Sequence, residues 1–166
     1  LYGGIIIDTN NFTSKTGVRT FEAAAFLRRC GADVTRVRKL FRENAAEYKA
    51  KADAVSQAEI YRNAYAISIC HSEGIASPTV VGAQAANELL DIRGVKASFV
   101  LTEYQNKLFF SARSIDEVNV QVIMERMGGG GHLNIAGCQL ENTSVEEGII
   151  VLKRTLDKMI EEGEIS

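Results

Sequence analysis

The sequence lacks several features that mark large classes of protein. Its 19 lysine and arginine residues do not outnumber its 21 aspartate and glutamate residues, and the formal net charge is -2. A dedicated nucleic-acid binder usually carries a basic excess, so any phosphate-binding site in this chain must be local. The sequence also contains no signal peptide and no apolar run long enough to form a membrane-spanning helix.

Cysteine is scarce as well. The three cysteines, Cys30, Cys70 and Cys138, are odd in number, lie far apart in the chain and form no CxxC motif. This pattern excludes a disulfide framework and a zinc site built from cysteine pairs. It favours a reduced, cytosolic environment.

What the chain does contain is ordinary globular composition, with 46% hydrophobic and 24% charged residues. Its 166 residues suffice for one domain, or for one small domain and a piece of another. The first residues, "LYGGIIID", include no methionine and lie next to a predicted strand. We therefore expect a segment of a longer protein.

The first third of the sequence predicts one strand followed by helices. The run Gly4–Asp8 is β-branched and ends in a carboxylate, which is typical of a buried parallel strand. The helical segments that follow are Phe21–Cys30 with Thr20 as its N-cap and Gly31 at its end, a helix capped by Asp33 that runs through Phe41, and a charged linker helix over residues 43–56.

From residue 58 onward, strands and helices alternate. The predicted elements are two strands in 58–70 around a turn at 62–64, a helix that starts at Ser77 and Pro78, two strands in 95–114 around a turn at 105–106, a helix at 118–127, a strand at 136–141 and an amphipathic helix at 144–162. The capping box "SIDE" (Ser114–Glu117) precedes the helix at 118–127, and Asn119 is an alternative cap for that helix. This order predicts an α/β domain with a mixed β-sheet and packed helices. No internal repeat is visible.

Four consecutive glycines stand in "MGGGGHLNIAG" (Met127–Gly137). One interpretation is a flexible linker, but linkers usually mix glycine with serine over many residues. The other is an anion-binding loop, in which successive backbone N–H groups form a concave nest for phosphate oxygens. Glycine permits the positive φ and the close approach that such a loop needs. The run therefore favours phosphate binding.

The glycine run matches neither of two familiar nucleotide motifs. No Gly-Lys-Ser/Thr follows it, so it is not a Walker loop, and Leu133 stands where the dinucleotide fingerprint needs its third glycine. His132 directly after the run would add a donor beside the nest. An ordinary core or capping histidine is the alternative, and the sequence leaves both open.

The strand "LFFSARS" carries a second candidate. Side chains alternate along a strand, so its two sets of side chains face opposite ways. If the core set is Leu108, Phe110 and Ala112, the outward set is Phe109, Ser111 and Arg113. Arg113 then lies near the strand end, where a guanidinium can hold a phosphate with two hydrogen bonds. The alternative is a solvated arginine on an exposed face.

Asp8 is a third candidate, because ligand sites in open α/β folds lie at the carboxyl ends of parallel strands. An aspartate in that place can bind a divalent metal. A turn-forming aspartate before Thr9 is the alternative. One carboxylate makes no metal site, and the sequence shows no further cluster of His and Asp; His71 is isolated.

These segments, in this order, resemble the C-terminal part of the DHH phosphoesterase superfamily. "GGIIIDTNNFTSKTGVRTFEAAAFLRRCGAD" (residues 3–33) resembles the last segment of a DHH catalytic domain. "FFSARS" together with "NVQVIMERMGGGGHLNIAGCQL" resembles the DHH-associated domain (DHHA1), whose hallmark is a glycine run followed by histidine. In detail, the sequence of these segments is most similar to the GdpP/YybT type, the membrane-bound cyclic di-AMP phosphodiesterases. The resemblance covers essentially the whole chain.

The resemblance implies a hydrolase that cleaves cyclic di-AMP to a linear dinucleotide with two manganese ions (Mn²⁺) held by Asp and His residues. Asp8 matches the last of these metal ligands. The others lie upstream of Leu1 in the family, so this segment alone is expected to be inactive and to bind no Mn²⁺. The substrate phosphate outside the metal centre is implied to contact Ser111, Arg113, Gly129, Gly130, Gly131 and His132.

The same resemblance divides the chain into residues 1–33, the end of the catalytic domain, 34–57, a connecting helix, and 58–166, the substrate-binding domain. It implies a cytoplasmic domain of a membrane-anchored bacterial protein, with no membrane contact by this part. The partner is a cyclic dinucleotide or a short oligonucleotide, and a homodimer is one option. Two alternatives stay open: a relative of RecJ- or nanoRNase-type enzymes acting on single-stranded nucleic acid or short oligonucleotides, and a non-catalytic nucleotide-binding or dimerisation module.

Overall fold

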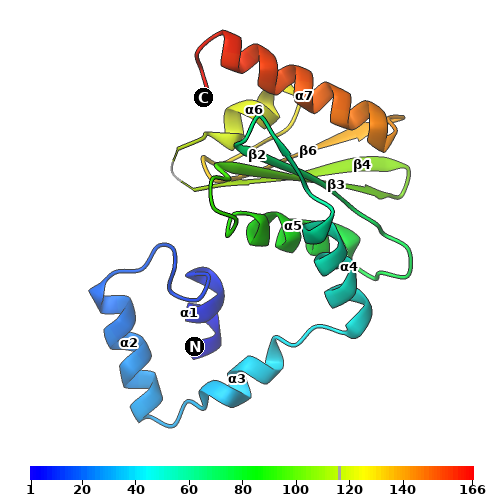
Figure 1. Cartoon of the computed structure of the whole chain (residues 1–166). Coiled ribbons are helices and arrows are strands. Elements are labelled where there is room, and N and C mark those ends of the chain that lie inside the picture. Colours follow the sequence, from blue (N-terminus) through cyan, green and yellow to red (C-terminus); the bar gives the residue numbers. More distant parts are fainter. Residues whose placement is uncertain (116) are drawn as a thin grey trace. The chain divides into compact units, whose positions relative to one another are not determined.

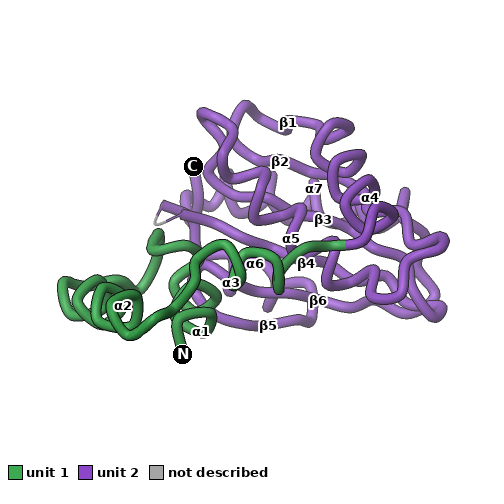
Figure 2. The backbone as a smooth tube through the Cα atoms, turned by 90° about the horizontal axis from the view of Figure 1, so that it is seen from below, with its two compact units in different colours: residues 1–43 green, residues 44–166 purple. Residues whose placement is uncertain are grey.

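The computed structural model describes residues 1–115 and 117–166. The chain forms two compact units, residues 1–43 and residues 44–166 (Figure 2). The predicted connecting helix at 34–57 is thus two helices, one in each unit. No helix within the described residues combines the length and the apolarity needed to cross a bilayer.

The first unit is helical throughout its regular structure. Its elements are α1 (Tyr2–Asp8), α2 (Val18–Arg29) and α3 (Val34–Leu40). The predicted strand at Gly4–Asp8 is wrong, because these residues belong to α1, and no residue of α1 is buried. A strand needs a neighbour to pair its backbone groups, and no described residue of this unit lies in a strand. A helix pairs these groups locally, as in the bond from Ile5 N–H to the Leu1 carbonyl.

The ends of α2 and α3 follow local signals. Helix α2 begins at Val18 rather than Phe21, so Thr20 is not its N-cap; its hydroxyl instead accepts a hydrogen bond from Gly17 N–H at 3.4 Å. Gly31 follows the helix with φ of 100°, as the predicted stop requires. The Asp33 carboxylate accepts bonds from two N–H groups of α3, which confirms the predicted cap.

The second unit is built on one six-stranded mixed sheet with the order β1-β2-β3-β4-β6-β5. The strands are β1 (Glu59–Tyr61), β2 (Tyr65–Cys70), β3 (Ala97–Tyr104), β4 (Lys107–Ser114), β5 (Gly130–Gly131) and β6 (Ile135–Glu141). Strands β2 and β3 are parallel, and every other neighbouring pair is antiparallel. Two tight turns with positive φ join β1 to β2 at Arg62-Asn63 and β3 to β4 at Gln105-Asn106, as predicted.

Helices cover both faces of this sheet (Figure 1). They are α4 (Ala45–Ser56) and α5 (Pro78–Leu89) on one face, and α6 (Val120–Arg126) and α7 (Val145–Glu161) on the other. The first core cluster packs under α6 and α7 and includes Phe99, Leu101, Leu108, Ile123 and Leu152. The second packs under α4 and α5 and includes Ala54, Val81, Leu89 and Val100. The predicted α/β fold with a mixed sheet is confirmed.

Helix α4 is part of this domain rather than a free linker. Ala54 is buried in the second core cluster, and its carbonyl accepts a hydrogen bond from the buried hydroxyl of Ser68 on β2. The mostly polar sequence of α4 concealed this role, because a helix can dock through a narrow stripe of small residues.

The start of α6 corrects the predicted capping box. Ser114 is the last residue of β4, and its hydroxyl lies 3.2 Å from the Asn134 side-chain oxygen. Asn119 is the N-cap, and its side-chain oxygen accepts bonds from the N–H groups of Gln121 and Val122. One residue of the "SIDE" motif, Asp116, lies outside the described residues.

We expect Asn119→Ala to destabilise the second unit by about 1 kcal/mol, because two N–H groups lose their acceptor. Asn119→Ser keeps a capping oxygen and should recover most of that loss. Urea unfolding of both variants measures the difference. Equal stabilities of Asn119→Ala and the unchanged protein would show that another group caps α6.

Candidate functional site

The four glycines form the turn and the edge strand that follow α6. Gly128 has φ of 88°, and the N–H of Gly129 donates to the Met124 carbonyl at 2.8 Å. Gly130 and Gly131 form β5, which pairs with β6. The run is therefore not a flexible linker, because its backbone is held by hydrogen bonds on both sides of the turn.

Two of these glycines are required by close packing. A Cβ at Gly129 would lie 2.1 Å from the carbonyl oxygen of Gly137, and one at Gly131 would lie 2.5 Å from the carbonyl oxygen of Ile135. Gly130 differs, since its φ is not positive and no atom lies within 4 Å of the place of its Cβ. Gly130 therefore does not use the positive φ that glycine would permit in an anion-binding loop, and its outer side is open.

The nest of backbone donors is smaller than the sequence indicated. The N–H of Gly129 is used within the protein, and the N–H of His132 donates to the Ile135 carbonyl at 2.7 Å, which closes the hairpin between β5 and β6. The His132 side chain is exposed at this hairpin. Anion binding here therefore depends on side chains and on the room that the glycines leave.

The sheet register places the predicted residues of β4 on one face with the glycines. Ser111 pairs with Gly137 on β6, and Gly137 pairs in turn with Gly130 on β5. Arg113 pairs with Ile135 at the end of β6 that enters the hairpin. Partners of this kind point to the same face. Their neighbours along β4 are buried in the first core, so the predicted alternation is confirmed.

Arg113 is a half-buried cation with unused donors. One terminal nitrogen donates to the carbonyl of Ala112 at 2.9 Å, whereas its Nε is buried without a partner. No carboxylate of the described residues forms an ion pair with it. Burial lowers the pKa of Arg113, because desolvation disfavours the charged form. The side chain is thus a positive group held in place and available to an anion.

A shallow depression of about 330 Å³ lies beside the glycine turn, and Phe109, Gly137 and Gln139 of this sheet face contribute to it. Its lining comes from β4, β6 and the glycine turn, and consists of Phe109, Phe110, Gly128, Gly129, Gly137, Cys138 and Gln139. The outer face of β6 is accessible here, since Ile135 is 54% exposed. Sequence analysis did not single out Gly137 or Gln139; the alternation along β6 was the signal that could have found them.

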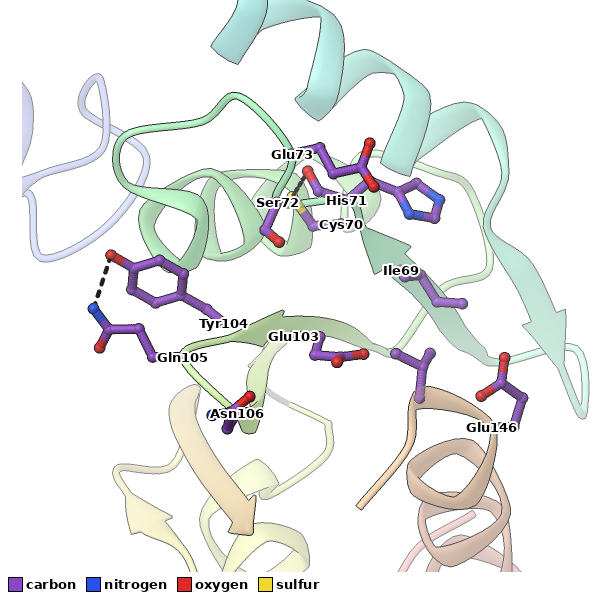
Figure 3. A pocket seen from close by; sticks show the side chains of 11 residues that line it. Ile69, Cys70, His71, Ser72, Glu73, Glu103, Tyr104, Gln105, Asn106 and Glu146 are labelled. Carbon is purple, nitrogen blue, oxygen red and sulfur yellow. Dashed lines mark hydrogen bonds between the residues drawn. The ribbon is translucent and has the colours of Figure 1, made fainter. Parts of the chain in front are cut away.

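A larger cavity of about 550 Å³ lies where the parallel strands β2 and β3 end (Figure 3). Glu73 after β2, Glu103 on β3 and Glu146 on α7 supply carboxylates to it, beside His71. None of its lining residues among those the structure describes is a lysine or an arginine. Like charges repel, so this cavity suits a phosphate poorly despite its size.

Asp8, the predicted metal ligand, ends α1 in the first unit and is exposed. The sequence predicted Asp8 at the carboxyl end of a parallel strand, and this prediction is wrong because the segment is a helix. No three His, Cys, Asp or Glu side chains of the described residues come together as a metal site. The described residues therefore do not by themselves form a site for a bound metal.

The family model of the DHHA1 domain matches residues 63–162. The chain belongs to the DHHA1 domain family. The matched range contains the whole glycine hairpin and Arg113, so both lie within the DHHA1 domain proper. The resemblance inferred from the glycine run and "FFSARS" is confirmed.

Two curated relatives extend the similarity beyond the DHHA1 domain. The chain is 45% identical over 148 residues to the cyclic-di-AMP phosphodiesterase PdeA of Listeria monocytogenes, covering 89% of this chain and 22% of the relative. It is 42% identical over 164 residues to the cyclic-di-AMP phosphodiesterase GdpP of Geobacillus thermodenitrificans, covering 98% of this chain and 25% of the relative. The chain thus spans about a quarter of the length of these proteins.

A solved structure supports the fold. An exopolyphosphatase-related protein from Bacteroides fragilis superimposes with a TM-score of 0.82 over 93% of this chain and 48% of that chain, at 21% identity. At this identity, the likeness shows a shared fold and says nothing about substrate.

Proposed function

We propose that this chain is the substrate-binding part of a phosphodiesterase that hydrolyses cyclic di-AMP to a linear dinucleotide. The relatives named above are cyclic-di-AMP phosphodiesterases and match nearly the whole chain. The observation that carries the proposal is Arg113, a half-buried guanidinium with an unpartnered Nε, on the same sheet face as the glycine hairpin. An anionic ligand would pair with the terminal nitrogen of Arg113 that donates to no described residue.

In this proposal, Arg113 holds a phosphate of the substrate with charge-assisted hydrogen bonds. Ser111, on the same strand face, supplies a hydroxyl, and His132 supplies a ring donor from the hairpin. Gly129 and Gly131 let β5 and its turn lie against β6, and Gly130 leaves its outer side free for the ligand. The chain thus binds and orients the substrate.

We further propose that residues 1–33 end a catalytic domain and that Asp8 contributes one ligand to a pair of Mn²⁺ ions. The remaining ligands would come from outside this chain, since no metal cluster forms among the residues described here. A metal pair would supply an activated water for phosphodiester hydrolysis.

Calorimetric titration of the chain with cyclic di-AMP, a linear diadenylate and a single-stranded oligonucleotide tests the proposal. We expect cyclic di-AMP to bind more tightly than the oligonucleotide. Tighter binding of the oligonucleotide would favour an exonuclease-like substrate. Absence of binding by cyclic di-AMP and by the linear diadenylate would overturn the proposed function of this chain.

We expect the chain alone to release no linear dinucleotide from cyclic di-AMP when Mn²⁺ is added, because a two-metal reaction needs several ligands and no group of three metal ligands forms among the described residues. Chromatography of the nucleotide products after prolonged incubation measures this. Turnover that depends on Mn²⁺ would show that the chain holds a complete metal site.

A further inference from the structure

Phe109 is an aromatic side chain that the two cores of the domain do not use. It is half-buried on β4, between Leu108 and Phe110, which both belong to the first core cluster. Among the described residues, Phe109 packs into neither cluster. It points to the same face as Arg113 and contributes to the depression beside the glycine turn. A partly covered aromatic ring on such a face is suited to contact a flat ligand.

Gln139 lies directly across from Phe109 on β6. It is exposed, and its amide has no hydrogen-bond partner within residues 1–115 and 117–166. A glutamine amide presents one donor group and one acceptor side by side. This pair of functions matches the donor and acceptor on an edge of adenine.

The floor between these side chains and Arg113 is bare backbone. The next row of the sheet consists of Ser111, Gly137 and Gly130, so two of its three residues have no side chain. Gly137 cannot easily gain one, because its Cβ would lie 2.9 Å from the carbonyl oxygen of Phe110. The depression of about 330 Å³ is at the small end of ligand pockets, so it suits a single base.

The spacing along β4 matches one nucleotide. Ser111 lies midway between Phe109 and Arg113, and two residues of a strand advance about 7 Å. A base above Gly137 and a phosphate at Arg113 are separated by that step, which a ribose bridges. The base then lies next to the ring of Phe109 with one edge toward Gln139.

We infer that Phe109 and Gln139 form an adenine-binding subsite next to the phosphate position at Arg113, on the sheet face that α4 and α5 cover in part and that stays exposed along β6. This inference rests on the proposed function, since it takes Arg113 as the phosphate contact. Phe109 contributes ring contact, and the Gln139 amide bonds to the base edge and its exocyclic amino group. Neither residue takes part in bond cleavage; both determine which nucleotide binds.

Phe109 is tested by calorimetry with two ligands, cyclic di-AMP and its abasic analogue, the cyclic ribose-phosphate dinucleotide. We expect Phe109→Ala to weaken cyclic di-AMP binding about 10-fold or more and to leave the abasic affinity unchanged, because base–aromatic contact is lost only where a base is present. Arg113→Ala should weaken both ligands. An equal effect of Phe109→Ala on both ligands, or no effect on either, would overturn the inference.

Gln139 is tested with cyclic di-AMP and the analogue in which purine, without the exocyclic amino group, replaces adenine. Gln139→Ala should weaken cyclic di-AMP several-fold and the purine analogue less, since one hydrogen bond is absent there in both proteins. Equal losses for the two ligands would remove Gln139 from the subsite.

Two controls keep these results interpretable. Phe109→Leu retains apolar volume without a ring, so it should fold like the unchanged protein and still bind cyclic di-AMP more weakly; it replaces Phe109→Ala if the melting temperature of that variant falls. Binding of cyclic di-AMP by the unchanged chain, with all Phe109 and Gln139 variants equal to it, would refute only the subsite. Absence of binding by the unchanged chain would refute the proposed function.

Discussion

Gly129→Ala is expected to destabilise the DHHA1 domain strongly, whereas the same change at Gly130 leaves the fold intact. The new Cβ at residue 129 would lie 2.1 Å from the carbonyl oxygen of Gly137 and 2.7 Å from the Cβ of Cys138. Both are parts of β6, which is fixed in the sheet between β4 and β5. The turn and β6 would have to separate, and overpacking of this kind costs about 1–3 kcal/mol or more. Thermal and urea unfolding measure the loss.

Gly130→Ala is the matched control. The place of its Cβ is empty within 4 Å and its φ is not positive, so alanine fits the backbone. Stability should stay unchanged or rise by up to about 1 kcal/mol, because alanine restricts the unfolded chain. The methyl group does project onto the proposed ligand face, so cyclic di-AMP should bind more weakly. Unfolding of Gly130→Ala to the same extent as Gly129→Ala would contradict this account of the hairpin.

Arg113→Ala is expected to weaken cyclic di-AMP binding by about 10- to 100-fold, the equivalent of a charge-assisted hydrogen bond worth roughly 1.5–3 kcal/mol. Folding should suffer little. The Nε of Arg113 is buried without a partner, and burial lowers the pKa of the group, so the folded protein already bears a desolvation cost for this cation. Its removal takes away that cost together with the ligand contact. Calorimetry and melting temperature on the same samples separate the two effects.

Arg113→Lys tests whether the guanidinium shape matters beyond its charge. Lysine keeps the positive charge but loses the planar fork that binds two phosphate oxygens at once, so it should recover only part of the affinity. Full affinity in Arg113→Ala would place the phosphate elsewhere in the domain. A large fall in melting temperature for both variants would instead make Arg113 a residue that supports the fold.

The parts of the fold that the sequence predicted correctly carry local or periodic signals. The turns at Arg62-Asn63 and Gln105-Asn106 consist of residues that tolerate positive φ, and the alternation along β4 repeats every second residue. Helix α7 was predicted from its amphipathic period, and in the structure it begins at a capping box formed by Ser144 and Glu147. Each of these signals predicts local structure without knowledge of the tertiary contacts.

The sequence predictions were wrong where contacts with other parts of the fold determine the local structure. Gly4–Asp8 has the composition of a strand, but a strand forms only against a partner, and the first unit provides none among its described residues. Ser114 and Asn119 both suit an N-cap, and pairing of Ser114 with Ala97 on β3 left Asn119 to cap α6. Helix α4 has little apolar surface, and only its packing on α5 and β2 shows that it belongs to the second unit.

The features of the candidate site also separate into those that the sequence determines and those that depend on the tertiary structure. The sequence by itself determined the DHHA1 family, the glycine run and the outward direction of Ser111 and Arg113, because these depend on residue identity and on strand period. Only the tertiary structure decided that the glycines pack against β6 and that Phe109 and Gln139 lie opposite each other. These relations join residues up to 30 positions apart in the chain, and they exist only once the strand register is set by hydrogen bonds and by burial of the opposite face.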